Sequence, residues 1–158
     1  MPRKITPFLW FENQAEEAMN FYVSVFKDSE VLEVTRNVEG GPGPEGSVLV
    51  VTFRLESQEF MALNGGPHVK LNEAISFVVD CADQEEIDYF WEKLSEGGEP
   101  GPCGWLKDEF GLSWQIVPAV LATLMSDADP KKASNTTRAM MQMRKLDIAA
   151  LQEAHDAT

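Results

Sequence analysis

Two stretches of the chain repeat the same order of residue types, and this repeat decides the fold. Residues 8–22 read FLWFENQAEEAMNFY and residues 77–91 read FVVDCADQEEIDYFW, so they align without a gap at an offset of 69 residues. In each stretch, a short apolar run typical of a β-strand precedes a polar turn and a helix that begins with acidic residues. The repetition predicts two similar modules.

Both repeats predict a helix with one apolar face. In the first, Asn13 is the expected N-cap, because a short polar side chain there can accept from the first free amides. In the second, Asp83 and Glu86 have the spacing of a capping box, and Gly97-Gly98 is expected to end the helix. The predicted apolar faces are Ala15, Ala18, Met19, Tyr22, Val25 and Phe26 in the first helix, and Ile87, Phe90, Trp91 and Leu94 in the second.

Further strands follow each helix. They are predicted over residues 31–36, 47–55 and 59–63 in the first half, and over residues 104–107 and 112–117 in the second. Residues 39–46 are too rich in glycine and proline for regular structure, and residues 108–111 form a turn that needs a positive φ at Gly111. The sequence therefore predicts an α+β fold of paired βαβββ modules, in which residues 5–64 and 72–118 superpose.

The remaining residues predict added helices. Apolar residues follow Pro118, Asp129-Pro130 has the pattern of a helix start, and Asp147 is expected to cap a last helix. Ala133, Met140 and Met141 are expected on the apolar side of the middle helix. We therefore expect a paired-module domain over residues 1–118, with module one at about 3–66 and module two at about 70–118, and a helical extension of the same domain over residues 119–158.

Composition narrows the possible partners and compartments. The 158 residues suit one domain, and the formal net charge of −13 opposes binding to a nucleic-acid backbone. No apolar run is long enough for a membrane span, and residues 1–8 lack the pattern of a signal peptide. The two cysteines suit a reducing compartment, so we expect a cytoplasmic protein. With only two histidines, His68 and His155, one chain cannot build a multi-histidine metal centre.

Several motifs together resemble one family. They are Pro7-Phe8-Leu9-Trp10-Phe11, the Ala15–Tyr22 helix, Asn64-Gly65-Gly66-Pro67 and residues 103–115, which read CGWLKDEFGLSWQ. Over residues 3–118 the chain resembles the PhnB-like proteins, which are frequently labelled 3-demethylubiquinone-9 3-methyltransferases. These belong to the vicinal oxygen chelate superfamily, with glyoxalase I, bleomycin-resistance proteins and extradiol dioxygenases. The resemblance extends to residues 139–149.

The resemblance implies sheets that curl around a cavity and a homodimer, for which we expect the C-terminal helices at or near the interface. It also implies where a metal would bind. The ligand positions of the superfamily fall near Pro7, Ala62, Ala74 and at Gln115 of this sequence. Proline and alanine offer no donor, and one neutral amide does not hold a divalent metal. Glu59, Asn64 or Ser76 would supply donors only if the strand register shifted by two, so we expect no metal and no other cofactor.

The methyltransferase label is disfavoured by the positions of the glycines. Sites for S-adenosylmethionine usually place a glycine-rich turn between a strand and a following helix, where backbone amides can bind the ligand. The glycine clusters at residues 39–46, 64–67 and 97–102 lead towards strands or follow a helix.

These arguments leave a metal-free small-molecule-binding protein of the glyoxalase/bleomycin-resistance type, with an unknown ligand; the acidity favours a cationic one. Alternatives are a metal-dependent lyase, isomerase or dioxygenase-like enzyme, a methyltransferase, and a dimeric scaffold without a ligand. Cys103 is expected to be an inert thiol because no base adjoins it in sequence, and Cys81 is expected to be buried or at a helix entrance. The predicted pocket residues are Leu9, Phe11, Asn64, Cys103, Trp105 and Gln115.

Overall fold

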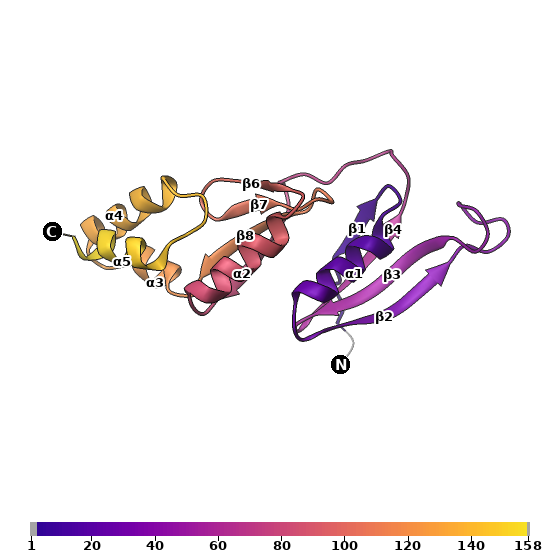
Figure 1. Cartoon of the computed structure of the whole chain (residues 1–158), viewed down its shortest axis with the longest axis horizontal. Coiled ribbons are helices and arrows are strands. Elements are labelled where there is room, and N and C mark those ends of the chain that lie inside the picture. The colour runs from indigo at the N-terminus through magenta and orange to yellow at the C-terminus, as the bar shows by residue number, and fades with distance from the viewer. Residues whose placement is uncertain (1–2, 158) are drawn as a thin grey trace. The chain divides into compact units, whose positions relative to one another are not determined.

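The computed structural model describes residues 3–157, which divide into two compact units with the boundary between Leu71 and Asn72. The first unit has the elements β1 (Phe8–Phe11), α1 (Ala15–Val25), β2 (Ser29–Arg36), β3 (Val48–Leu55) and β4 (Gln58–Asn64). Its strands form one sheet in the order β1-β4-β3-β2, in which β1 and β4 are parallel and the other pairs antiparallel. Helix α1 lies against one face of this sheet (Figure 1).

The second unit repeats this arrangement. Its elements β5 (Ser76–Cys81), α2 (Gln84–Ser95), β6 (Glu99–Pro100), β7 (Trp105–Lys107) and β8 (Ser113–Pro118) give a sheet in the order β5-β8-β7-β6, with β5 and β8 parallel. Strand for strand, this is the order of the first unit. The predicted α+β fold of paired βαβββ modules is therefore confirmed, although the short β6 was not predicted because it lies within a glycine- and proline-rich segment.

Three helices complete the second unit: α3 (Leu121–Met125), α4 (Pro130–Met141) and α5 (Ile148–Asp156). They enclose a small core of Leu124, Leu146 and Leu151. The predicted caps of the last two are confirmed, because Asp129 accepts a hydrogen bond from the Lys131 amide at 2.9 Å and Asp147 accepts one from the Ala150 amide at 3.0 Å. With α1 and α2, the described residues contain five helices, and none of them is long and apolar enough to cross a membrane.

The core of each sheet lies beneath its helix. In the first unit, the Tyr22 ring of α1 stacks on Phe53 of β3 at a centroid distance of 6.1 Å, and Phe53 stacks on Phe60 of β4 at 5.5 Å. Leu9 and Phe11 of β1 are buried, whereas the alternating Phe8 is exposed and Trp10 is half-buried. The helix-covered face of β1 is therefore the face of Leu9 and Phe11, and Trp10 lies on the open face.

The two module helices are capped differently. As predicted, the Asp83 side chain accepts from the Glu86 amide at 2.9 Å, and Gly97 ends α2 with a φ of +77°. The prediction of Asn13 as the cap of α1 is wrong. The Asn64 side chain at the end of β4 accepts from the Ala15 amide at 2.8 Å, so a residue 49 positions later caps this helix.

The predicted apolar side of α4 is also partly wrong. Met141 is 57% exposed, whereas Thr136 is completely buried. Thr136 can be buried because its hydroxyl donates to the Lys132 carbonyl at 2.9 Å, which leaves only its methyl group to pack. Met140 packs against the small C-terminal core, as expected for that face.

Candidate functional site

Each unit has a cavity of a size that suits a small molecule. The Trp105 cavity of the second unit has a volume of about 480 Å³ and is lined by Glu73, Glu99, Pro100, Gly101, Pro102, Cys103, Trp105, Leu106, Lys107 and Ser113. The Trp10 cavity of the first unit has a volume of about 780 Å³. It is lined by residues of β1, α1, β3 and β4 and of the adjoining loops, including Trp10, Glu12, Asn64 and His68. Both volumes fall in the range of small-molecule sites, roughly 300–1,000 Å³.

The Trp105 cavity is built on β6, β7 and the loop that joins them. This loop is tight, because the Gly101 amide donates to the Trp105 carbonyl at 2.8 Å and the Trp105 amide donates to the Pro102 carbonyl at 3.0 Å. Cys103 and Gly104 have φ values of +59° and +83°, so the chain turns through two left-handed residues before β7. The left-handed conformation is unusual for a cysteine and holds Cys103 at the cavity wall.

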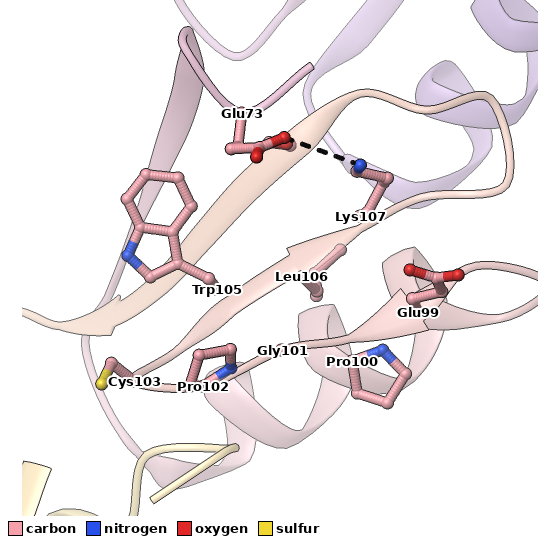
Figure 2. Close-up of a pocket in the computed structure, with 10 residues that line it drawn as sticks. Glu73, Glu99, Pro100, Gly101, Pro102, Cys103, Trp105, Leu106 and Lys107 are labelled. Carbon is pink, nitrogen blue, oxygen red and sulfur yellow. Dashed lines mark ion pairs between the residues drawn. The ribbon is translucent and has the colours of Figure 1, made fainter. Parts of the chain in front are cut away.

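The cavity combines apolar walls with one ion pair. Figure 2 shows the Trp105 ring beside Glu73, whose carboxylate points towards Lys107, with Pro100, Pro102 and Cys103 along the strand and loop below. The Lys107 ammonium lies 3.7 Å from the Glu73 carboxylate, and their side chains are 39% and 73% exposed. An exposed pair of this kind contributes only ~0–1 kcal/mol to stability, so either partner is available to a ligand.

Gln115 lies beside this cavity, on β8. It pairs directly with Trp105 of β7, and directly opposed residues of antiparallel strands share a face of the sheet. Its side-chain amide donates to the Ser76 hydroxyl at 3.0 Å. Three predicted pocket residues therefore occupy one region of the second unit: Cys103 and Trp105 line the cavity, and Gln115 is the cross-strand neighbour of Trp105.

The cysteines differ in accessibility. Cys103 is half-buried, and its sulfur lies 3.7 Å from the sulfur of the exposed Met141. Cys81 is completely buried, as expected, and burial, together with the nearby Glu86, Asp80 and Asp83 carboxylates, raises the pKa of its thiol to about 12. Cys81 therefore stays protonated at neutral pH and is not a nucleophile.

The Trp10 cavity contains Asn64, another predicted pocket residue. Both polar atoms of its side chain make hydrogen bonds within the protein. The oxygen accepts from the Ala15 amide, and the nitrogen donates to the Val48 carbonyl at 3.1 Å. Trp10 is fixed as well, because its indole donates to the Gly66 carbonyl at 2.9 Å. Glu16 and Glu17, also at this cavity, lie in the first turn of α1, where they interact favourably with the helix dipole.

The other two predicted pocket residues, Leu9 and Phe11, line neither of these cavities. Both belong to the core under α1. The alternative face of β1 carries Trp10, which does line a cavity.

The positions expected for metal ligands do not supply a donor set. Ala62 is completely buried, and its neighbours in β4 are Met61 and Leu63, neither of which is a ligand for a hard divalent cation. Gln115 hydrogen-bonds Ser76, a pair of neutral groups. Within residues 3–157, no group of three or more His, Cys, Asp or Glu side chains is placed to hold a metal ion. The described residues of one chain therefore do not fit the metal of the superfamily.

The structural role of Asp108 was not predicted from the sequence. Its side chain is only 3% exposed and accepts from the Phe110 amide at 2.9 Å, the Leu112 amide at 3.0 Å and the Trp114 indole at 2.9 Å. It thus fixes the turn between β7 and β8, where Gly111 has the predicted positive φ of +92°. The signal was present, because aspartate before a turn often accepts from amides that follow it.

Comparison with known proteins places the chain in a family. The family model described as 3-demethylubiquinone-9 3-methyltransferase matches residues 3–117. No curated protein gives a match.

Solved structures share the fold. A PhnB protein from Bacillus cereus is 42% identical, with a TM-score of 0.65, and the match covers 74% of this chain and 100% of that one. Protein PA1353 from Pseudomonas aeruginosa is 19% identical, with a TM-score of 0.59 over 74% of this chain and 98% of that one. The fosfomycin resistance protein FosX from Mesorhizobium loti is 11% identical, with a TM-score of 0.51 over 73% of this chain and 90% of that one, and shows the fold alone. The predicted PhnB-like resemblance is thus confirmed, and the chain belongs to the family described as 3-demethylubiquinone-9 3-methyltransferase.

Proposed function

We propose that this protein binds a small organic molecule in the Trp105 cavity, without a metal ion. The observation that carries the proposal is the convergence of Cys103 and Trp105 on one cavity, with Gln115 as the neighbour of Trp105 on the next strand. The sequence alone predicts all three as pocket residues.

The lining indicates the kind of molecule. Trp105, Pro100 and Pro102 offer flat apolar surface for a ring or a short hydrocarbon. Lys107 and Glu73 offer one charge of each sign, and their weak pairing means that a charged group of the ligand can replace either partner. The Gln115 amide can orient the ligand if it exchanges its bond to Ser76 for one to the ligand.

Methyl transfer is not the function that this geometry supports best. The glycine-rich segments lie between β2 and β3, after β4, and between α2 and β7, so none of them leads from a strand directly into a helix. An S-adenosylmethionine site that uses backbone amides at a helix N-terminus would need that arrangement. A metal-dependent reaction needs a donor set, which the residues at the expected ligand positions do not supply.

Thermal unfolding with a panel of cationic, neutral and anionic metabolites and antibiotics tests the proposal. A ligand at 100 times its Kd stabilises the folded state by about 2.7 kcal/mol, which for a chain of this size raises the Tm by roughly 5–10 °C. Including all three charge classes tests the expected preference for cations.

Two matched variants assign the ligand to a cavity. Trp105→Phe alters the Trp105 cavity and Trp10→Phe alters the other one, each by replacing one indole with a smaller ring. We expect Trp105→Phe to weaken the Tm shift and Trp10→Phe to leave it unchanged. The reverse result would refute the assignment to the Trp105 cavity. A panel that gives no shift with the native chain would favour the scaffold alternative instead.

A further inference from the structure

The C-terminal helices lie outside the family match, yet they contact the wall of the Trp105 cavity. The match ends at residue 117, and the whole Bacillus cereus chain corresponds to 74% of this one. Residues 143–146, which we call the strap, run along the loop that carries Cys103. The Cys103 amide donates to the Met143 carbonyl at 2.8 Å, and the Gly104 amide donates to the Arg144 carbonyl at 2.8 Å.

Two further contacts hold the strap on the cavity wall. The Arg144 guanidinium donates to the Pro100 carbonyl at 3.3 Å. Leu146 packs so closely on Gly104 that an added Cβ there would lie 3.0 Å from a Leu146 methyl carbon. The two left-handed residues of the loop are thus held by main-chain and side-chain contacts from the C-terminal extension.

The strap in turn depends on α5. Leu146 is buried together with Leu124 of α3 and Leu151 of α5, so its burial requires that α5 stays docked. Helix α5 begins at Ile148, two residues after the strap ends. A movement of α5 would therefore displace the strap.

One histidine fastens α5 to the link between α3 and α4. His155 is only 9% exposed, and both of its ring nitrogens face carboxylates: Nε2 lies 2.8 Å from Asp127 and Nδ1 lies 2.8 Å from Asp156. A neutral imidazole carries one N–H, so only the imidazolium can donate to both carboxylates. Asp156 lies on α5 itself, so the Nε2 contact with Asp127 is the one that joins α5 to this link. A neutral ring has a single N–H for the two carboxylates and leaves a lone pair facing one of them, which weakens this contact.

The surroundings of His155 favour the charged ring. Helix α3 has no charged residue, and Lys132 of α4 interacts electrostatically with both aspartates. The Asp129 amide donates a hydrogen bond to the Asp127 carboxylate at 2.8 Å, and the Gln152 side-chain amide donates one to the Asp156 carboxylate at 3.1 Å. The hydrogen bonds to Asp156 and Asp127 raise the pKa of His155 above its ordinary value of 6.5.

We propose that the C-terminal helices form a pH-dependent brace for the wall of the Trp105 cavity, fastened by the imidazolium of His155 between Asp127 and Asp156. When the ring loses its proton, α5 loosens, the strap follows, and the loop of Cys103 and Gly104 is released. The brace rests on the proposed function in one respect only: release of this loop would change how a ligand binds in the Trp105 cavity.

Amide hydrogen exchange measured by NMR tests the brace without any ligand. The readout is the protection factor of the Cys103 and Gly104 amides, each normalised to its intrinsic exchange rate, from pH 5.5 to 8.5. Because a charge-assisted hydrogen bond is lost, we expect protection to fall by about 10-fold or more as the pH rises. Amides of β3, in the other unit, serve as the reference. His155 is titrated in the same samples through its ring protons.

Three variants complete the test. His155→Gln should show low protection at Cys103 and Gly104 at every pH, and Asp127→Asn, which keeps the ring but removes one carboxylate, should reduce the pH-dependent change. His68→Gln, in the first unit, should leave the native profile unchanged. If His155→Gln also loses the protection of the β8 amides, its second unit has unfolded, and the test then rests on Asp127→Asn.

Either of two results overturns the brace. One is a pH profile for His155→Gln and Asp127→Asn that is the same as in the native chain, and the other is a loosening of α5 that leaves the Cys103 and Gly104 amides protected. Failure to find a ligand would refute the proposed function, but it would not change what the hydrogen-exchange measurement says about the brace.

Discussion

Asp108 provides the sharpest test of the packing in the second unit. Replacing it with alanine would leave three N–H donors without their acceptor: the Phe110 and Leu112 amides and the Trp114 indole. The site is nearly solvent-free, and each buried donor left without a partner costs ~1–3 kcal/mol, so we expect Asp108→Ala to lower the free energy of unfolding by roughly 3–6 kcal/mol.

Asp108→Asn gives a finer measurement, because it preserves the volume. One amide oxygen can still accept from the two backbone amides, but the NH₂ group then faces the Trp114 indole N–H at the place of the second oxygen. The expected loss is about 1.5–3 kcal/mol, the value of one hydrogen bond to a charged group. In a Trp114→Phe background, which has no indole N–H, the same substitution should cost at least ~1 kcal/mol less.

Urea unfolding followed by far-UV circular dichroism measures these differences, with the exposed neighbour Glu109→Ala as the control, expected to stay within ~0.5 kcal/mol of the native chain. A loss below ~0.5 kcal/mol for Asp108→Asn, or an equal loss in both backgrounds, would refute the reasoning that the indole depends on this carboxylate.

Four further predictions follow from other residues. Gly65→Ala would place a Cβ 2.3 Å from the Trp10 ring, so we expect ~1–3 kcal/mol of destabilisation in urea and a red-shifted tryptophan emission. Gln115→Ala should weaken a ligand of the Trp105 cavity by roughly 0.5–1.5 kcal/mol in calorimetry, and Gln115→Leu by at least as much; unchanged affinity would exclude Gln115 from the site. Because the pKa of His155 is raised, its contribution to stability is complete below its ordinary pKa of 6.5 and is lost as the pH rises through the folded value, so the urea midpoint should fall there in the native chain and not in His155→Gln. We expect a homodimer, which a monomeric mass by light scattering at tens of micromolar, unchanged on further concentration, would contradict.

The sequence predicted the elements well because their signals are local. The repeat at residues 8–22 and 77–91, the capping box at Asp83 and the helix start at Asp129 each depend on neighbours within a few positions. Both modules and the order of their elements along the chain follow from these signals and the family resemblance.

The face of β1 could not be predicted in the same way. All four residues of this strand are apolar, so the alternation that normally separates a core face from an open face is absent. Only the position of α1 decides that Leu9 and Phe11 are buried and that Trp10 lies on the open face. The position of Cys103 and Trp105 at one cavity was predictable because the two residues are neighbours in one short loop and strand, in which Gly101 and Pro102 also line the cavity. The contact between the strap and this loop could not be predicted. It joins residues about 40 positions apart through main-chain carbonyls, which any sequence offers.

The different caps of the two module helices have a consequence for the order in which the chain folds. Helix α2 carries its own capping box, so its N-terminus can be completed while only residues near Asp83 are ordered. Helix α1 takes its cap from Asn64, and this bond can form only after the chain has closed a loop of 49 residues and paired β4 with β1. Contacts between distant residues form slowly because the entropy of loop closure is lost before the contact is gained. Two modules with the same topology should therefore fold by different routes, with the helix formed early in the second and stabilised only by the finished sheet in the first.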